Sequence, residues 1–258
     1  AHNKGVLHLG GITSDPYCAT MQNMTNNGAI SLNGIYDGAV KIAGCFGYHD
    51  KELLILKNCT NNAPITVLGE ANSTTATYVG GVCVAVQGKG PHSNIYNTEK
   101  GDILVNLSKA VANVTVAGIT NKFQDHSNDV VNNGDITVKG NYDGSLYITG
   151  FCYASNNYTR ARHGNTGNFL VDAKIGGTLC VGGMYCYGQY GGTFTECFNT
   201  GNYTISENTE IGKGAYIGGM IGYFNATYAT YAYKNCYNSG NISFKGKAGI
   251  STEEVADT

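Results

Sequence analysis

Pairs of apolar residues recur along the chain at the spacing of a β-strand. A single residue, most often Ser or Thr, separates the two members of a pair, and the first members stand at Ile30, Ile65, Ile103, Ile136, Phe169, Tyr203 and Ile242. Side chains alternate between the two faces of a strand, so both members of each pair face the same way, and we expect them to point inward. The pairs recur every 33 to 39 residues, which marks a repeated unit.

A second phrase follows each pair and ends in a small residue and a glycine, as in Tyr216-Ile-Gly-Gly-Met220. Its apolar residues form another expected core column: Leu9, Ile42, Val79, Val116, Ile148, Val181 and Ile217. The residue after each glycine is again apolar, which breaks the alternation by one place. We expect a bulge or corner there, because glycine accepts the backbone angles that a bend needs.

A column of polar residues precedes each apolar pair, here called the first phrase, and predicts a turn in every unit. It runs Asn26, Asn61, Glu99, Asn132, Asn165, Asn199 and Asn238, and a Gly or Ala follows two residues after each of them. Stacked asparagines can hydrogen-bond from one unit to the next, and glycine supplies the left-handed backbone of a turn.

Self-similarity at this period predicts a solenoid. We therefore predict an all-β fold, a right-handed parallel β-helix of about seven coils of 33–39 residues, with residues 1–246 as a single domain. Residues 247–258 lose the pattern and become acidic, which is typical of a tail, a cap or a linker. The pattern starts in mid-coil at Val6 and stops at Phe244, so we expect a longer polypeptide or head-to-tail association of copies to complete the ends.

Composition narrows the classes of partner. The net charge is −2 and only 13% of residues are charged, without a basic stripe, which argues against nucleic acid. No apolar run reaches the roughly 18 to 20 residues of a membrane helix, so no membrane span is expected in this segment. The cysteines and histidines do not have the spacing of a zinc site, and we expect neither a metal nor a cofactor.

Two of the nine cysteines, Cys197 and Cys236, occupy the same position in neighbouring units. Stacked strands lie roughly 4.8 Å apart, which is within reach of a disulfide between coils. The alternative is a small hydrophobic residue in a core column, and we favour it because free cysteine tolerates burial well.

Two phrases carry a resemblance to a known family: Cys197-Phe-Asn-Thr-Gly-Asn-Tyr203 with Val181-Gly-Gly-Met184, and Cys236-Tyr-Asn-Ser-Gly-Asn-Ile242 with Ile217-Gly-Gly-Met220. They resemble GLUG-type repeats of bacterial surface proteins and adhesins, especially those of gut Bacteroidetes. The resemblance covers residues 6–246. It implies a parallel β-helix in a secreted or cell-surface protein and carries no catalytic motif.

Two groups of residues are candidates for a site. Tyr78, Tyr147 and Tyr216 share one outward column, and aromatic rings suit glycan binding, although tyrosine is also a common strand former on a half-exposed sheet. The second group is a polar cluster of Asp125, His126, Arg160, Arg162 and His163, which is either catalytic or a solvated corner.

We expect a non-enzymatic, adhesin-like or structural β-solenoid at the cell surface or outside the cell, binding a host or environmental glycan or protein surface. The alternative is a carbohydrate-active enzyme, either a polysaccharide lyase or a glycoside hydrolase. Hydrolysis needs two carboxylates about 5 to 9 Å apart. The outward columns contain no stacked pair of carboxylates in this reading, since Asp129 aligns with Arg162 and Glu196 as a charge ladder.

Overall fold

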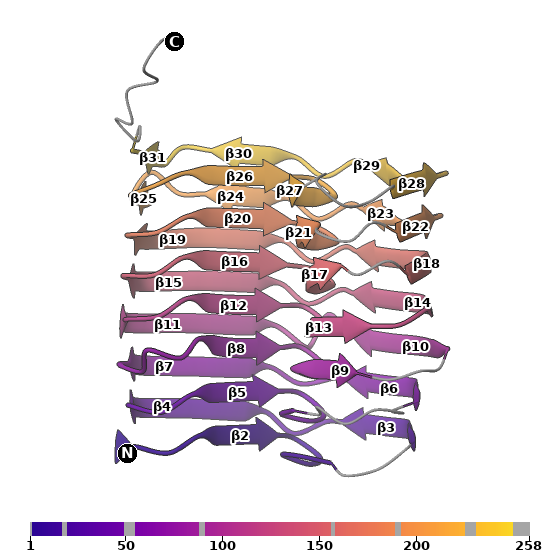
Figure 1. The fold of residues 1–258 in the computed structure, drawn as a ribbon, viewed down its shortest axis with the longest axis horizontal. Helices are drawn as coiled ribbons and strands as arrows, with labels where there is room; N and C mark the ends of the chain where they lie inside the picture. Colours follow the sequence, from indigo (N-terminus) through magenta and orange to yellow (C-terminus); the bar gives the residue numbers. More distant parts are fainter. Residues whose placement is uncertain are drawn as a thin grey trace, which may run out of the picture.

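The computed structural model describes residues 2–16, 20–48, 55–87, 91–155, 158–188, 192–224 and 231–249. Within these ranges every regular element is a β-strand, and strands of successive coils pair in parallel. This confirms the predicted parallel β-solenoid (Figure 1). One sheet contains seven stacked strands, which corresponds to about six full turns of the chain rather than the predicted seven. The predicted right-handed path stays a prediction.

The strands form four sheets. Sheet 1 contains the first-phrase strands β1 (His2–Asn3), β4 (Ile30–Tyr36), β7 (Ile65–Ala71), β11 (Ile103–Ala110), β15 (Ile136–Tyr142), β19 (Phe169–Ile175), β24 (Tyr203–Ile205), β25 (Glu210–Ile211), β30 (Ile242–Phe244) and β31 (Lys247–Ala248). Sheet 2 contains the second-phrase strands β2 (Leu7–Gly10), β5 (Val40–Ala43), β8 (Thr77–Gly80), β12 (Val114–Ala117), β16 (Leu146–Thr149), β20 (Leu179–Gly182) and β26 (Ala215–Gly218).

The other two sheets complete the coil. Sheet 3 follows the glycine pair with β9 (Ala85–Gln87), β13 (Thr120–Gln124), β17 (Cys152–Ser155), β21 (Tyr185–Gly188) and β27 (Ile221–Phe224). Sheet 4 leads back to the next first phrase with β3 (Thr20–Asn26), β6 (Ile55–Asn61), β10 (His92–Asn97), β14 (Ser127–Asn132), β18 (Tyr158–Asn165), β22 (Gly192–Thr195), β23 (Phe198–Asn199), β28 (Tyr231–Lys234) and β29 (Tyr237–Asn238).

The strand register confirms both apolar columns. Ile136 pairs with Ile103 on one side and with Phe169 on the other. In sheet 2, Val116 lies between Val79 and Ile148 in the same way. All six residues are at most 1% exposed. Equivalent apolar residues therefore stack from coil to coil, as the repeat predicts.

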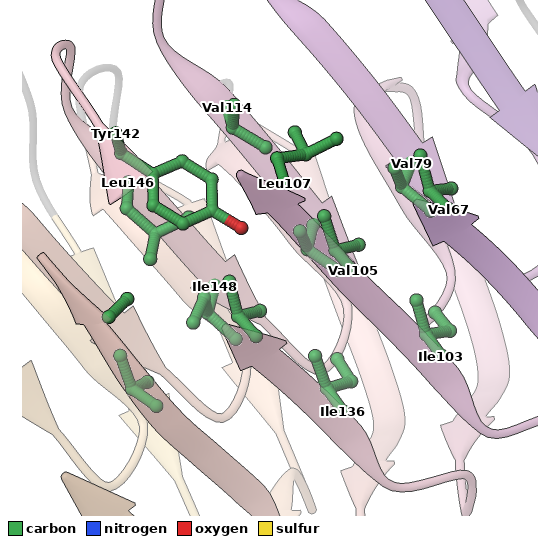
Figure 2. Close-up of a cluster of buried hydrophobic side chains, with 14 of the residues drawn as sticks. Val67, Val79, Ile103, Val105, Leu107, Val114, Ile136, Tyr142, Leu146 and Ile148 are labelled. Atoms are coloured by element: carbon green, nitrogen blue, oxygen red, sulfur yellow. The ribbon is translucent and has the colours of Figure 1, made fainter. Parts of the chain in front are cut away.

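The interior is divided into two hydrophobic cores. One core lies between sheets 1 and 2 and is built from the two phrases; Figure 2 shows its central part, including Val105 and Ile148. The other lies between sheets 3 and 4 and contains Phe123, Phe151 and several cysteines. Apart from the exposed Ile12, the apolar residue after each glycine belongs to this second core or packs against it. The break in alternation is therefore the point where the chain passes from one core to the other.

A ladder of asparagines, buried except for its last member, runs between the two cores. Each side-chain Nδ2 donates to the Oδ1 of the asparagine in the next coil, over 2.7–2.9 Å from Asn26 to Asn238. In the third coil the ladder residue is Asn97 and not Glu99, which corrects the sequence alignment. Asn97 Nδ2 still reaches the carbonyl of Gly101 at 2.8 Å, because a turn from Thr98 to Gly101 takes up the two extra residues.

The second-phrase glycines pack directly on this ladder. A Cβ on Gly118 would lie 2.2 Å from Cγ of Asn132, and one on Gly44 would lie 2.3 Å from Cγ of Asn61. No side chain fits at such a distance. The asparagine turn and the glycine pair, far apart in each repeat, are therefore one packing unit in space.

Regular pairing extends two residues beyond the expected domain boundary, since Lys247 and Ala248 of β31 pair with Glu210 and Ile211 of β25. Residues 250–258, the rest of the expected acidic segment, lie outside the described residues. The described part of the chain contains no helix that is long and apolar enough to cross a membrane.

Candidate functional site

Tyrosine side chains gather where the outer faces of sheets 2 and 3 meet. Tyr147 of β16 contacts Tyr153 of β17, with ring centroids 4.7 Å apart and an angle of 61° between the rings. Tyr216 of β26 contacts Tyr223 of β27 in nearly the same way, at 4.7 Å and 60°. The sheet 2 and sheet 3 strands of one coil therefore face each other through outward side chains.

Tyr187 of β21 joins these two pairs. Its ring stacks on Tyr223 at 5.3 Å and 18°, and on Tyr153 at 6.5 Å and 19°. Tyr147, Tyr153, Tyr187, Tyr216 and Tyr223 thus form one continuous group, here called the tyrosine cluster. None of the five belongs to either hydrophobic core. Their rings are therefore not needed to fill the interior.

Two of the three tyrosines predicted from the sequence belong to the cluster. Tyr78 lies on the same sheet 2 column, with Thr115 between it and Tyr147. The sequence pattern did not indicate Tyr153, Tyr187 and Tyr223, because it did not predict sheet 3 as a separate strand. A signal was present, since a tyrosine stands four places after the glycine in Gly44-Cys-Phe-Gly-Tyr48, at Tyr187 and at Tyr223.

Ring stacking limits what the cluster offers to a ligand. The Tyr187 and Tyr223 rings, with centroids 5.3 Å apart, partly cover each other's faces and leave edges and hydroxyl groups for contact. Burial raises the pKa of Tyr153, so its hydroxyl stays protonated as a hydrogen-bond donor. Tyr216 is the most open ring, at 44% exposure. The surface thus combines one open aromatic ring with phenol hydroxyls.

Nearer the N-terminus the same face carries charge. The Lys41 ammonium lies 3.4 Å from the centroid of the Tyr48 ring, and His8 contacts that ring at 5.3 Å between centroids. His8 Nδ1 also lies 3.7 Å from the Asp15 carboxylate. Polar and aromatic side chains therefore continue along this face beyond the tyrosine cluster.

The predicted polar cluster is divided between the interior and the surface. Arg160 and His163 are fully buried, whereas His126 is exposed and Arg162 pairs at the surface with Asp129, with Nε 2.6 Å from Oδ1. Arg162 has a positive φ of 54°. This left-handed residue breaks the alternation of β18, and Arg160 and Arg162 consequently do not share a face.

Inside the second core, the Arg160 guanidinium is held by neutral partners. Its Nε donates to the Tyr185 hydroxyl at 3.1 Å, and it also donates to the main-chain carbonyls of Asp125 and Phe123. His163 Nε2 lies 3.1 Å from the Ser127 hydroxyl. Burial, and secondarily the charge of Arg160, holds the pKa of His163 well below 6.5. These buried groups therefore lie out of reach of a substrate at the surface.

A positive φ recurs once in every strand region of sheet 4, at Asn23, Asn58, Asn94, Asp129, Arg162, Glu196 and Asn235. The side chains form a ladder: Asn58 donates to Asn23 at 2.8 Å, and Asn94 donates to Asn58 at 2.9 Å. The predicted alignment of Asp129 with Arg162 is confirmed by their ion pair. The side chains of this ladder are partly exposed, which is typical of a structural surface ladder rather than a catalytic site.

Cys197 and Cys236 are adjacent but not bonded to each other. Both thiols are free, Cys197 is buried, and Cys236 is partly buried. Burial raises the pKa of Cys197 to about 12, and the neighbouring Cys236 thiol adds to this shift. In this structure they fill a core column, as the favoured interpretation predicts.

One pair of carboxylates was overlooked in the sequence. Asp102 and Asp135 precede Ile103 and Ile136, which pair in register, so the two aspartates occupy equivalent exposed positions in neighbouring coils. Asp102 Oδ1 accepts a hydrogen bond from the Asp135 main-chain N–H at 2.9 Å. A surface pocket contains both, together with Thr66, Thr137 and Lys139. The expectation that no outward carboxylates stack is therefore wrong.

Among the described residues, no three His, Cys, Asp or Glu side chains gather closely enough to hold a metal ion. Comparison of this chain with protein-family models, with curated proteins and with solved structures finds no significant match.

Proposed function

We propose that this protein is an extracellular, non-enzymatic, adhesin-like β-solenoid that binds glycans through the tyrosine cluster. The observation that supports this proposal is a continuous group of five tyrosines lying outside both cores, with one ring 44% exposed. Tyrosine combines an apolar ring with a hydroxyl, which suits the apolar faces and polar rims of sugars. The resemblance to GLUG-type surface repeats points to the same class.

Repeat architecture suits such a function. Successive coils add tyrosines to the same face, and Tyr153, Tyr187 and Tyr223 follow one another along the stack. A solenoid presents an extended surface of this kind without a deep cleft. A polymer lying along the axis would therefore meet several rings at once, and weak contacts with each would add.

A glycan array followed by affinity electrophoresis in polysaccharide gels tests the proposal. Tyr216→Ala should lower the affinity for a bound glycan about fivefold, since an aromatic contact contributes roughly 1 kcal/mol. Tyr237→Ala is the matched control, because Tyr237 is 55% exposed on sheet 4, away from the cluster. Equal affinity of both variants, or no glycan bound by the unaltered protein, would refute the proposal.

A polysaccharide-active enzyme is the second candidate, and the stacked pair Asp102 and Asp135 favours it. Two neighbouring carboxylates are what glycoside hydrolysis requires. A reducing-sugar assay over the same polysaccharides separates the candidates. Turnover that Asp135→Asn abolishes, with the fold unchanged, would establish the enzyme and overturn the non-enzymatic proposal.

A further inference from the structure

An unusual polar position lies beside the tyrosine cluster, in the third coil. Asn121 of β13 has the register position that Tyr153 and Cys186 occupy in the next two coils. Those two residues contact sheet 2, Tyr153 through the Tyr147 ring and Cys186 through Cys180. Asn121 is therefore placed to face sheet 2 as they do. Its counterpart there is Thr115, which lies between Tyr78 and Tyr147.

The Asn121 side chain is buried without a hydrogen bond. It is 3% exposed, and neither its Nδ2 nor its Oδ1 has a partner in the described part of the chain. Buried amides are almost always paired, and an unpaired one costs stability. The equivalent residue Cys186, by contrast, donates its thiol to the carbonyl of Ile148 at 2.9 Å. An amide kept in this position offers both a donor and an acceptor to a ligand.

The residue that follows Asn121 in the chain is a lysine. Lys122 is exposed and makes no ion pair within the described ranges. Asn121 and Lys122 both donate their main-chain N–H to the Val84 carbonyl, at 2.9 and 3.2 Å, which marks a bulge. Farther along the same face lie Lys41, which contacts Tyr48, and His8, which contacts Asp15. Lys122, which has the register position of Tyr187, and Lys41 therefore both bring an ammonium group to this face.

We propose that Asn121 and Lys122, flanked by Tyr78 and Tyr147, bind a carboxylate-bearing sugar, that is, a uronic acid residue of an acidic glycan. The inference rests on the proposed glycan-binding function and names its ligand class. Lys122 pairs with the sugar carboxylate, and the Asn121 amide hydrogen-bonds to neighbouring hydroxyl groups. The surrounding side chains change rotamer on binding, since the amide is almost fully covered in the free protein.

Paired ligands test the charge preference. Isothermal titration with oligogalacturonates and oligoglucuronates is compared with the same oligosaccharides after reduction of their carboxyl groups to alcohols. We expect at least tenfold tighter binding of an acidic form, weakening as salt is raised. Lys122→Gln should remove this preference and leave binding of the reduced form unchanged. Lys109→Gln is the control, an exposed lysine of sheet 1.

Asn121→Leu separates a binding role from a structural one. If the unpaired amide serves a ligand, the variant melts at a higher temperature than the unaltered protein and binds the acidic oligosaccharide more weakly. A lower melting temperature would show that Asn121 supports the fold and would overturn its assignment. Equal binding of acidic and reduced oligosaccharides would overturn the uronate preference while leaving glycan binding intact. Failure to bind any glycan would reject the proposed function as well.

Discussion

The asparagine ladder predicts where a small substitution should be most damaging. Asn132 is fully buried. Its Nδ2 donates to the Gly134 carbonyl at 2.9 Å and to Asn165 Oδ1 at 2.8 Å, and its Oδ1 accepts from Asn97 Nδ2 at 2.8 Å. Asn132→Ala removes all three bonds in the space between the two cores. The Gly134 carbonyl and Asn165 Oδ1 each lose a donor, and Asn97 Nδ2 loses an acceptor.

Each such loss costs about 1–3 kcal/mol when the remaining group is buried. Asn97 Nδ2 keeps the Gly101 carbonyl as a partner, which reduces the total. We therefore expect Asn132→Ala to lower the free energy of unfolding by about 3–5 kcal/mol. For a chain of this length that corresponds to roughly 10 °C in melting temperature.

The effect should also be local, because each coil of a solenoid contacts only its neighbours. The amides of Asn133 and Thr166 donate across the affected turns to the carbonyls of Asn97 and Asn132, at 2.7 and 2.8 Å. Hydrogen exchange at these two amides should accelerate more than exchange in the first coils. Urea unfolding followed by circular dichroism supplies the free energy.

Asn238→Ala is the matched control. Asn238 is the exposed last member of the ladder, where water can replace the lost bonds, and its substitution should cost less than about 1 kcal/mol. A loss of similar size in both variants, or a loss below about 1 kcal/mol for Asn132→Ala, would show that the ladder does not stabilise the fold.

Two further predictions concern the interior. Burial lowers the pKa of His92 to about 4, so the unfolded chain binds protons that the folded one does not as pH falls from 6.5; the free energy of unfolding, measured by urea titration, should decline across that window by up to about 1.4 kcal/mol per pH unit, and less in His92→Phe. Val181→Asp places a charge at a position with 0% exposure and should abolish cooperative melting, whereas an unchanged melt would contradict the inward assignment.

The sequence alone determined the architecture, because a parallel solenoid repeats the same local environment in every coil. Equivalent residues stack at one strand spacing, so the environment of Ile136 can be inferred from Ile103 and Phe169. The asparagine turns and the glycine pairs were evident for the same reason. The alignment was wrong in the third coil, where two inserted residues moved the ladder position from Glu99 to Asn97.

Only the tertiary structure determined which side chains of different strands face one another. The bends after the glycine pairs bring sheet 3 against the outer face of sheet 2 and bring Tyr153, Tyr187 and Tyr223 to Tyr147 and Tyr216. A left-handed residue in each sheet 4 strand breaks the period of two, so that a charged Arg160 turns inward while Arg162 stays outside. Periodicity describes one strand at a time, and it cannot report contacts between strands that meet through a corner.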